Sequence, residues 1–163
     1  MGLSFRKAAM SPKALYRLFA VGEAITWALL ISALVLRLIA EDLSIAVTIA
    51  GTIHGVMFLS YCTTAVLVGI NQRWRLGKLA AAVSLAIVPF ATVPFDRSLL
   101  KKGELEGTWR TQGSDHPADK TMVDKLFRWF IARPLVLIVV LVLAVASLFS
   151  FLLFLGPPDQ WFD

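Results

Sequence analysis

Residues 15–36 read LYRLFAVGEAITWALLISALVL, an apolar run in which Arg17 and Glu23 are the charged side chains. An α-helix rises 1.5 Å per residue, so roughly 20 such residues cross a hydrocarbon layer about 30 Å thick. Backbone groups inside that layer must be hydrogen-bonded within the segment, which favours a helix. The run is long for a signal peptide and ends at Arg37 without a small-residue cleavage pattern. We therefore expect a retained transmembrane helix.

Three further apolar runs follow, at residues 44–70, 79–95 and 134–155. The whole chain is 58% apolar and 17% charged, which lies outside the usual composition of soluble domains. The polar connection that precedes the last run is too short to form an independent hydrophobic core. These observations predict an all-α fold, a multi-pass transmembrane helical bundle with four apolar helices.

The run at residues 79–95 is the shortest, and Pro89 and Pro94 lie near its end. Proline removes a backbone donor and clashes with the preceding turn, so this segment is either a proline-kinked crossing helix or a re-entrant or surface segment. Crossing is the preferred interpretation, because membrane helices tolerate proline. The expected segments are a cytoplasmic basic tail (1–14), a three-helix core (15–100), a polar loop with an amphipathic helix (101–133), a fourth transmembrane helix (134–155) and a C-terminal tail (156–163).

The polar connection is the segment at residues 101–133, and its second half has helical periodicity. Asp119 or Thr121 can cap this helix at its N-terminus. It either lies in the membrane interface or extends the fourth span beyond the lipid, and extension is the preferred interpretation. The apolar side chains that share one face are Met122, Leu126, Trp129 and Phe130.

The distribution of lysine and arginine bears on orientation, because these residues favour the cytoplasmic side of a membrane. Four crossing helices would place seven of them inside and nine outside, which is no bias. If residues 79–95 return to the side from which they enter, fifteen lie inside and Arg37 alone lies outside. We expect a cytoplasmic N-terminus and a location in the bacterial cytoplasmic (inner) membrane.

Glu23 and His54 are the ionisable side chains that lie well within the predicted spans. The short first loop makes the first two spans antiparallel neighbours, with Glu23 ~21 Å and His54 ~15 Å from that loop at 1.5 Å per residue. A carboxylate and an imidazole at such similar depths could share a hydrogen bond or a proton. The pair either handles protons or substrate or joins the two helices, and the joining role is preferred.

Small residues surround both positions. Gly51 and Gly55 bracket His54, and Ala20, Ala24 and Ala28 repeat at the same spacing beside Glu23. Such spacing lets two membrane helices approach closely, so we expect both sets to lie in helix contacts.

Charged residues also end two of the runs. Asp96 and Arg97 follow the third run, and Arg37 follows the first. If the third run crosses, these groups could form an ionic cluster at one membrane face. Anchoring of the span ends at the interface is the preferred interpretation.

Three local patterns resemble the YdzA-like family of small bacterial integral membrane proteins, a domain of unknown function. The patterns are Arg17-x5-Glu23-Ala24-x2-Trp27, Gly51-x-x-His54-Gly55 and Val88-Pro-Phe-x3-Pro-Phe-Asp96. The resemblance covers roughly residues 15–100, and the fourth span looks like an addition to that core. It implies that Glu23, His54 and Asp96 are the positions to examine first, and it brings no established activity.

The residue patterns contain no catalytic set. Cys62 is the single cysteine, and Asp115, His116 and Asp119 lack a further metal ligand, so we expect no metal, no cofactor and no enzymatic activity. The net charge of +5 comes from cations that flank the spans, which favours anionic lipid over nucleic acid as a partner.

Two functions compete. The leading hypothesis is a non-enzymatic accessory or assembly subunit of a larger bacterial membrane complex, with a respiratory-chain complex as one candidate. Its partners would be membrane lipids and other integral membrane subunits or further copies of the chain. The alternative is a small oligomeric proton-coupled transporter that uses Glu23 and His54.

Overall fold

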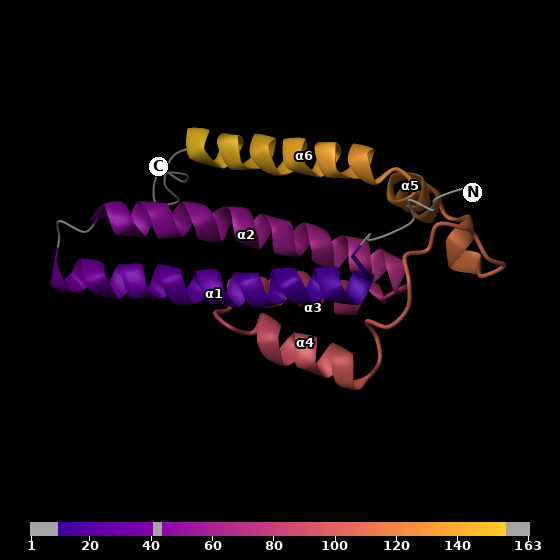
Figure 1. Ribbon diagram of the computed structural model, residues 1–163, viewed down its shortest axis with the longest axis horizontal. Coiled ribbons are helices and arrows are strands. Elements are labelled where there is room, and N and C mark those ends of the chain that lie inside the picture. Colours follow the sequence, from indigo (N-terminus) through magenta and orange to yellow (C-terminus); the bar gives the residue numbers. More distant parts are fainter. Residues whose placement is uncertain (1–9, 41–43, 156–163) are drawn as a thin grey trace, which may run out of the picture.

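A computed structural model describes residues 10–40 and 44–155. Two long helices run antiparallel along the molecule, α1 over Pro12–Ile39 and α2 over Ser44–Asn71 (Figure 1). α1 begins at Pro12 because Ser11 caps it, with its Oγ accepting a hydrogen bond from the Ala14 N–H at 3.2 Å. Both helices are long and apolar enough to cross a membrane, as the sequence predicts.

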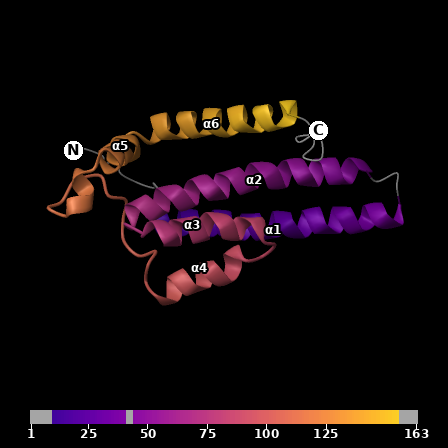
Figure 2. The same ribbon diagram turned by 180° about the vertical axis from the view of Figure 1, so that it is seen from behind.

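The third apolar run does not form a crossing helix. α3 spans Leu76–Ser84 and continues as a 3-10 turn, η2, over Leu85–Ile87. The chain then reverses, and α4 runs back over Thr92–Lys101 (Figure 2). We call residues 76–101 the hairpin. The preferred interpretation of a crossing helix over residues 79–95 is corrected here, since the chain reverses between η2 and α4 and the described residues contain three helices of membrane length, none of them in this run.

Length and backbone geometry explain the reversal. The helical residues from 76 to 87 rise only about 18 Å, well short of a ~30 Å hydrocarbon layer. Phe90 then adopts a φ of 63°, in the left-handed region, which ends any helix at that point. Pro94 lies in the first turn of α4, where its missing N–H would have no helical partner.

The hairpin covers only one half of α1. At its open end, Lys78 and Glu104 form an ion pair of 2.7 Å. Near its tip, the Trp27 indole N–H donates to the Ala86 carbonyl at 3.1 Å, and Trp27 lies close to the middle of α1. The tip therefore reaches the middle of the bundle. The buried core that these elements share consists of Tyr16, Ala20, Tyr61, Ala65, Val68, Ala82, Ala86, Leu99 and Leu105.

The polar connection leads through a 3-10 turn, η3 (Pro117–Lys120), to α5 (Met122–Ile131) and α6 (Pro134–Phe154). Of the two predicted caps, Asp119 and Thr121, it is Thr121 that caps α5, accepting a hydrogen bond from the Asp124 N–H at 3.3 Å. α5 does not extend α6: Figure 1 shows α5 almost end-on while α6 lies along the molecule. Pro134 explains the break, because it disfavours helical backbone at Arg133.

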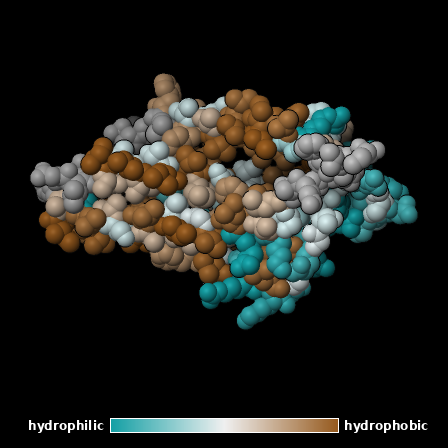
Figure 3. Space-filling view, in the orientation of Figure 1, coloured by the Kyte–Doolittle hydropathy of each residue, from teal (hydrophilic) through white to brown (hydrophobic). Residues whose placement is uncertain are grey.

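α6 is the third helix of membrane length, and its most apolar stretch has no buried residue. It lies along α2 and carries large exposed side chains such as Leu135, Val139 and Leu143. Figure 3 shows apolar side chains over most of this face and hydrophilic ones gathered at the end where α5 lies. Lipid or another protein must cover such a surface.

The cations confirm that the two ends of the bundle differ. Thirteen of the fourteen lysine and arginine residues in the described part of the chain belong to the half where α1 begins and α2 ends, and Arg37 belongs to the other end. We call the first of these the basic end. The reversal of the third run produces this separation, because it returns the polar connection to the end that it left.

Candidate functional site

Glu23 is fully buried between α1 and the hairpin. The Thr92 hydroxyl from α4 lies 2.9 Å from Glu23 Oε2 and 3.3 Å from the Ala20 carbonyl oxygen of α1. Glu23 Oε1 is buried and has no hydrogen-bond partner among the described residues. The carboxyl group is therefore held on one oxygen only, near the middle of a membrane-length helix.

His54 lies in the same region, buried on α2. Its Nδ1 is 3.0 Å from the Thr26 hydroxyl, and that hydroxyl lies 2.9 Å from the Glu23 carbonyl oxygen. The imidazole ring packs on the Trp27 ring with 4.4 Å between centroids. The sequence predicts Glu23 and His54 at similar depths, and the structure brings them together. No direct hydrogen bond between their side chains is formed; Thr26 links His54 to the Glu23 backbone. We call Glu23, Thr26, His54 and Thr92 the Glu23 cluster.

Two tyrosines extend this polar core toward the basic end. The hydroxyls of Tyr16 and Tyr61 are 2.9 Å apart, and the Tyr61 hydroxyl donates to the Ala82 carbonyl of α3 at 3.1 Å. Neither tyrosine nor Thr92 is predicted as a site residue from the sequence. A hydroxyl in an apolar run indicates a hydrogen-bond partner, because buried hydroxyls need one. The partners here belong to or contact the hairpin, whose position the sequence does not predict.

Asp96 and Arg37 lie at opposite ends of the described structure. Asp96 is buried one turn after Thr92 on α4, and its Oδ2 lies 3.6 Å from Arg17 Nε on α1. Arg97, the next residue, is exposed, and Arg37 lies in the last turn of α1. The cluster of Asp96, Arg97 and Arg37 that a crossing third span would make is therefore not formed.

The small residues do not form one continuous contact face. Ala20 is buried and Ala28 exposed, with Ala24 between these limits. A methyl group added at Gly51 would meet Leu30 of α1 at 3.9 Å, whereas one added at Gly55 would meet Phe149 of α6 at 3.1 Å. Positions four apart differ by about 40° around a helix, which turns Gly55 from α1 toward α6.

A second polar cluster, which we call the latch, consists of Arg73, Arg110, Arg128, Asp119 and Asp124. Asp119 accepts hydrogen bonds from Arg73 at 2.9 and 3.0 Å and from Arg110 at 2.8 Å. Asp124 accepts one from Arg110 at 2.6 Å and another from Arg128. Both carboxylates are buried. The latch joins the polar connection and α5 to the end of α2.

Arg110 also closes the C-terminus of α2. Its guanidinium donates to the carbonyls of Ile70 at 2.7 Å and Asn71 at 2.6 Å, and its backbone N–H donates to Asn71 Oδ1 at 2.8 Å. These carbonyls have no partner inside the helix, and a cation is favourable at that end of the helix dipole. From the sequence alone, Arg110 is only one of the cations that bear on orientation.

The pKa of Asp119 shows how strongly the latch favours the ionised carboxylate. Burial opposes ionisation, but hydrogen bonds from the Ser114 backbone and hydroxyl and from Arg73, with the charge of Arg110, lower the pKa well below its ordinary value. Within residues 10–40 and 44–155, no group of three His, Cys, Asp or Glu side chains could hold a metal ion. The latch is thus built from ion pairs within the chain.

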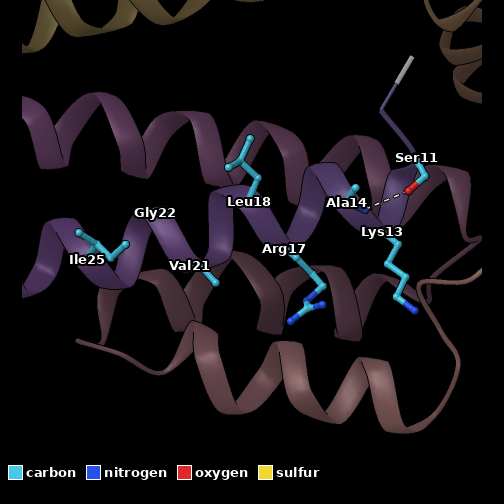
Figure 4. A pocket seen from close by; sticks show the side chains of 8 residues that line it. All are labelled: Ser11, Lys13, Ala14, Arg17, Leu18, Val21, Gly22 and Ile25. Carbon is cyan, nitrogen blue, oxygen red and sulfur yellow. Dashed lines mark hydrogen bonds between the residues drawn. The ribbon is translucent and has the colours of Figure 1, made fainter. Parts of the chain in front are cut away.

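Two of the grooves on the described surface lie along the long helices. One, of about 630 Å³, lies between α2 and α6 and is mainly apolar; its walls include Ser60, Thr63, Thr64, Leu141, Val145 and Phe149. The other, of about 570 Å³, follows α1 from Ser11 to Ile25. Figure 4 shows Lys13 and Arg17 of this second groove reaching toward α4. Arg17 pairs with Asp96 of α4, and Lys13 pairs at 2.6 Å with Glu106, which follows α4 in the chain. Both positive charges are therefore balanced.

The family model described as "Domain of unknown function (DUF3817)" matches residues 13–101, which hold α1, α2, the hairpin and the Glu23 cluster. "Putative membrane protein SCO5905" of Streptomyces coelicolor is 40% identical over 87 residues, 53% of this chain and 10% of that protein. "Uncharacterized membrane protein YdzA" of Bacillus subtilis is 37% identical over 57 residues, 35% of this chain and 59% of that protein. The resemblance seen in the sequence is confirmed. The chain spans less than two thirds of either relative's length, and no solved structure matches it.

Proposed function

This chain belongs to the DUF3817 family, and from that premise we propose that it is a non-enzymatic accessory or assembly subunit of a larger bacterial membrane complex. The observation that carries the proposal is the groove between α2 and α6. It lies at membrane depth between two helices of membrane length, one of which is unburied along its most apolar stretch. The partner it fits is a transmembrane helix of another subunit.

The walls of the groove favour a helix over lipid chains. Small hydroxyl residues, Ser60, Thr63 and Thr64, stand on its α2 side among aliphatic neighbours. Small side chains let a second backbone come close, and hydroxyls can bond across a helix interface, whereas an acyl chain offers no hydrogen bond. Side chains of a partner helix would enter between α2 and α6 as knobs into a hole.

The extent of the match to SCO5905 supports the same view. The matched region is 10% of that relative, so there the family core forms part of a much larger polypeptide. A core that occurs both in short chains and within a long one is suited to work against other protein segments. The alternative of independent action as a carrier has no comparable support.

Affinity purification in a mild detergent tests the proposal. We expect the tagged chain to recover a membrane protein in fixed stoichiometry, and Ala146→Trp, which fills the groove, to lose it. The matched control is Val139→Trp, which adds the same ring to an exposed α6 position that does not line the groove. Recovery of the wild-type chain with no stoichiometric partner in repeated experiments, or equal recovery by both variants, would reject the proposal.

We further propose that the basic end faces the cytoplasm of a bacterial cell, with the N-terminus on that side. The support is the separation of cations between the two ends of the bundle. In a Cys62→Ser background, single cysteines at Gln72 and Gly113 should react with an impermeant maleimide only after inside-out vesicles are made. A cysteine at Ala40 should react from the outside of intact cells. The opposite pattern would invert the proposed orientation.

A further inference from the structure

Two threonine hydroxyls occupy equivalent positions in the Glu23 cluster. Thr92 Oγ1 lies between the Ala20 carbonyl at 3.3 Å and Glu23 Oε2 at 2.9 Å. Thr26 Oγ1 lies between the Glu23 carbonyl at 2.9 Å and His54 Nδ1 at 3.0 Å. In each case a hydroxyl stands between a backbone oxygen of α1 and a titratable side chain.

Counting hydrogens favours a protonated Glu23. A hydroxyl has one hydrogen to donate, and an ionised carboxylate has none. If Glu23 were ionised, Thr92 could satisfy Oε2 or the Ala20 carbonyl but not both. If Oε2 carries a proton, Glu23 donates to Thr92 and Thr92 donates to Ala20, so both observed contacts are hydrogen bonds. We infer that Glu23 is a proton-binding site that is occupied in the folded protein.

The surroundings of Glu23 support a neutral acid. Glu23 is fully buried. Among the described residues, no lysine, arginine or histidine nitrogen lies within 4.0 Å of its carboxyl oxygens, the limit for an ion pair. An ionised carboxylate at this depth would leave Oε1 with charge and no partner, which is more costly than a neutral carbonyl oxygen there.

Other titratable groups face Glu23 from each packed element without supplying a positive charge to pair with it. α2 contributes Tyr61 and Cys62, which interact with Glu23, and His54, which is linked to the Glu23 backbone through Thr26. On α4, Asp96 lies one turn beyond Thr92. On α1, Arg17 lies toward the basic end, where it pairs with Asp96. The Arg17 charge is therefore already paired with another carboxylate.

The same counting favours one tautomer of His54. Thr26 gives its hydrogen to the Glu23 carbonyl, so His54 Nδ1 must donate to Thr26 Oγ1. His54 is thus protonated on Nδ1, and both titratable groups of the cluster act as donors. This assignment is independent of the proposed subunit role, because it rests on contacts within the chain.

The bound proton joins the hairpin to α1. Glu23 belongs to α1 and Thr92 to α4, so the hydrogen bond that the proton makes crosses between them. Ionisation removes that proton, leaves a carboxylate and breaks the chain of hydrogen bonds from Glu23 through Thr92 to Ala20. The packing of α4 therefore depends on occupancy of this site.

Infrared spectroscopy of the wild-type chain in lipid tests the occupancy directly. With 13C-labelled glutamate, we expect the carbonyl band of a protonated acid at neutral pH, shifted by the label and absent in Glu23→Gln. The control is Glu104→Gln, which removes a surface carboxylate paired with Lys78 and should leave the band unchanged. Absence of the band from wild-type protein, or its persistence in Glu23→Gln, would overturn the inference.

Hydrogen exchange of the α4 amides tests the coupling. Glu23→Gln keeps a neutral donor toward Thr92, and Thr92→Ser keeps the hydroxyl, so both should retain wild-type protection. Thr92→Val keeps the shape without the hydroxyl and should speed exchange about tenfold or more. Loss of protection in Glu23→Gln equal to that in Thr92→Val would mean that a charged carboxylate is required, which would contradict a bound proton.

Discussion

At the scale of single residues, the latch shows how a long polar connection is fixed without a hydrophobic core of its own. Arg110 bonds the last carbonyls of α2 and two buried carboxylates from beyond the loop. Its partners Asp119 and Asp124 are far from α2 in sequence, so spacing alone could not predict the contact. Thr121 could be predicted, because a helix cap depends only on its neighbours three residues along.

The lowered pKa of Asp119 predicts a dependence on acid. The ordinary pKa of this carboxyl group, which applies to the unfolded state, is 3.8, and the pKa in the folded state is lower. Asp119 therefore stabilises the folded state above pH 3.8, and this contribution is lost as the pH falls from there toward the lower, folded-state pKa. A spin label on Asp115→Cys should therefore become more mobile below about pH 4 and stay immobile at neutral pH. Asp119→Asn should mobilise the label at every pH. Mobility that rises with increasing pH would contradict the assigned sign.

The two glycines of the GxxxG pattern should respond differently to alanine. At Gly51 the added methyl group has ordinary contact distance to Leu30, and alanine favours helix, so Gly51→Ala should stabilise by about 0.5–1 kcal/mol or be neutral. At Gly55 the methyl group meets Phe149 at 3.1 Å, so Gly55→Ala should push α6 away from α2. Cross-linking between cysteines on α2 and α6 measures the displacement. Equal cross-linking in both variants would contradict this reading of the contacts.

At the scale of elements, the third apolar run is the instructive case. The prolines, the short length and the cation count all pointed to a reversal, yet tolerance of proline in membrane helices favoured a crossing. What the sequence could not supply was the partner surface: Trp27 and Tyr61 bond carbonyls of α3 and η2, and Thr92 bonds α1. Buried polar contacts from two other helices make a half-length hairpin stable at membrane depth.

The depth of the hairpin tip can be measured. Phe90 lies at the tip and is 45% exposed, so a probe there should contact lipid chains near the middle of the bilayer. In a Cys62→Ser background, a fluorophore on Phe90→Cys should be quenched most by lipids that carry the quencher deep in the acyl chain. The control, Lys102→Cys, should be quenched from water at the basic end. Reaction of Phe90→Cys with an aqueous reagent on the face opposite Lys102 would mean that the segment crosses.

At the scale of the whole molecule, most of the buried core lies in α1, α2 and the hairpin, and α6 lies beside α2. The sequence predicted a core over residues 15–100 with a fourth span added to it, and the family match ends at residue 101. In the described structure, α1, α2 and the hairpin hold most of the buried core, while the most apolar part of α6 is unburied. The relative placement of α5 and α6 was less accessible to prediction, since it depends on the latch and on the break at Pro134.

Removal of α6 should therefore leave the core folded. A chain that ends at Arg133 retains the latch and the Glu23 cluster, and its stability should fall by less than about 1 kcal/mol, because the lost helix buries little surface. Circular dichroism of detergent-solubilised protein during thermal unfolding measures the change, with the full chain as the reference. Aggregation or a non-cooperative transition of the shortened chain would show that α6 is part of the core.

The hairpin gives the molecule unequal width along the membrane normal. At the basic end, α3 and α4 share the cross-section with α1, α2 and α6, whereas the half beyond Trp27 contains no part of the hairpin. The protein is therefore a wedge, which displaces more lipid from one leaflet than from the other. We therefore expect its insertion to be least costly where the bilayer bends so that the leaflet at the basic end is the convex one.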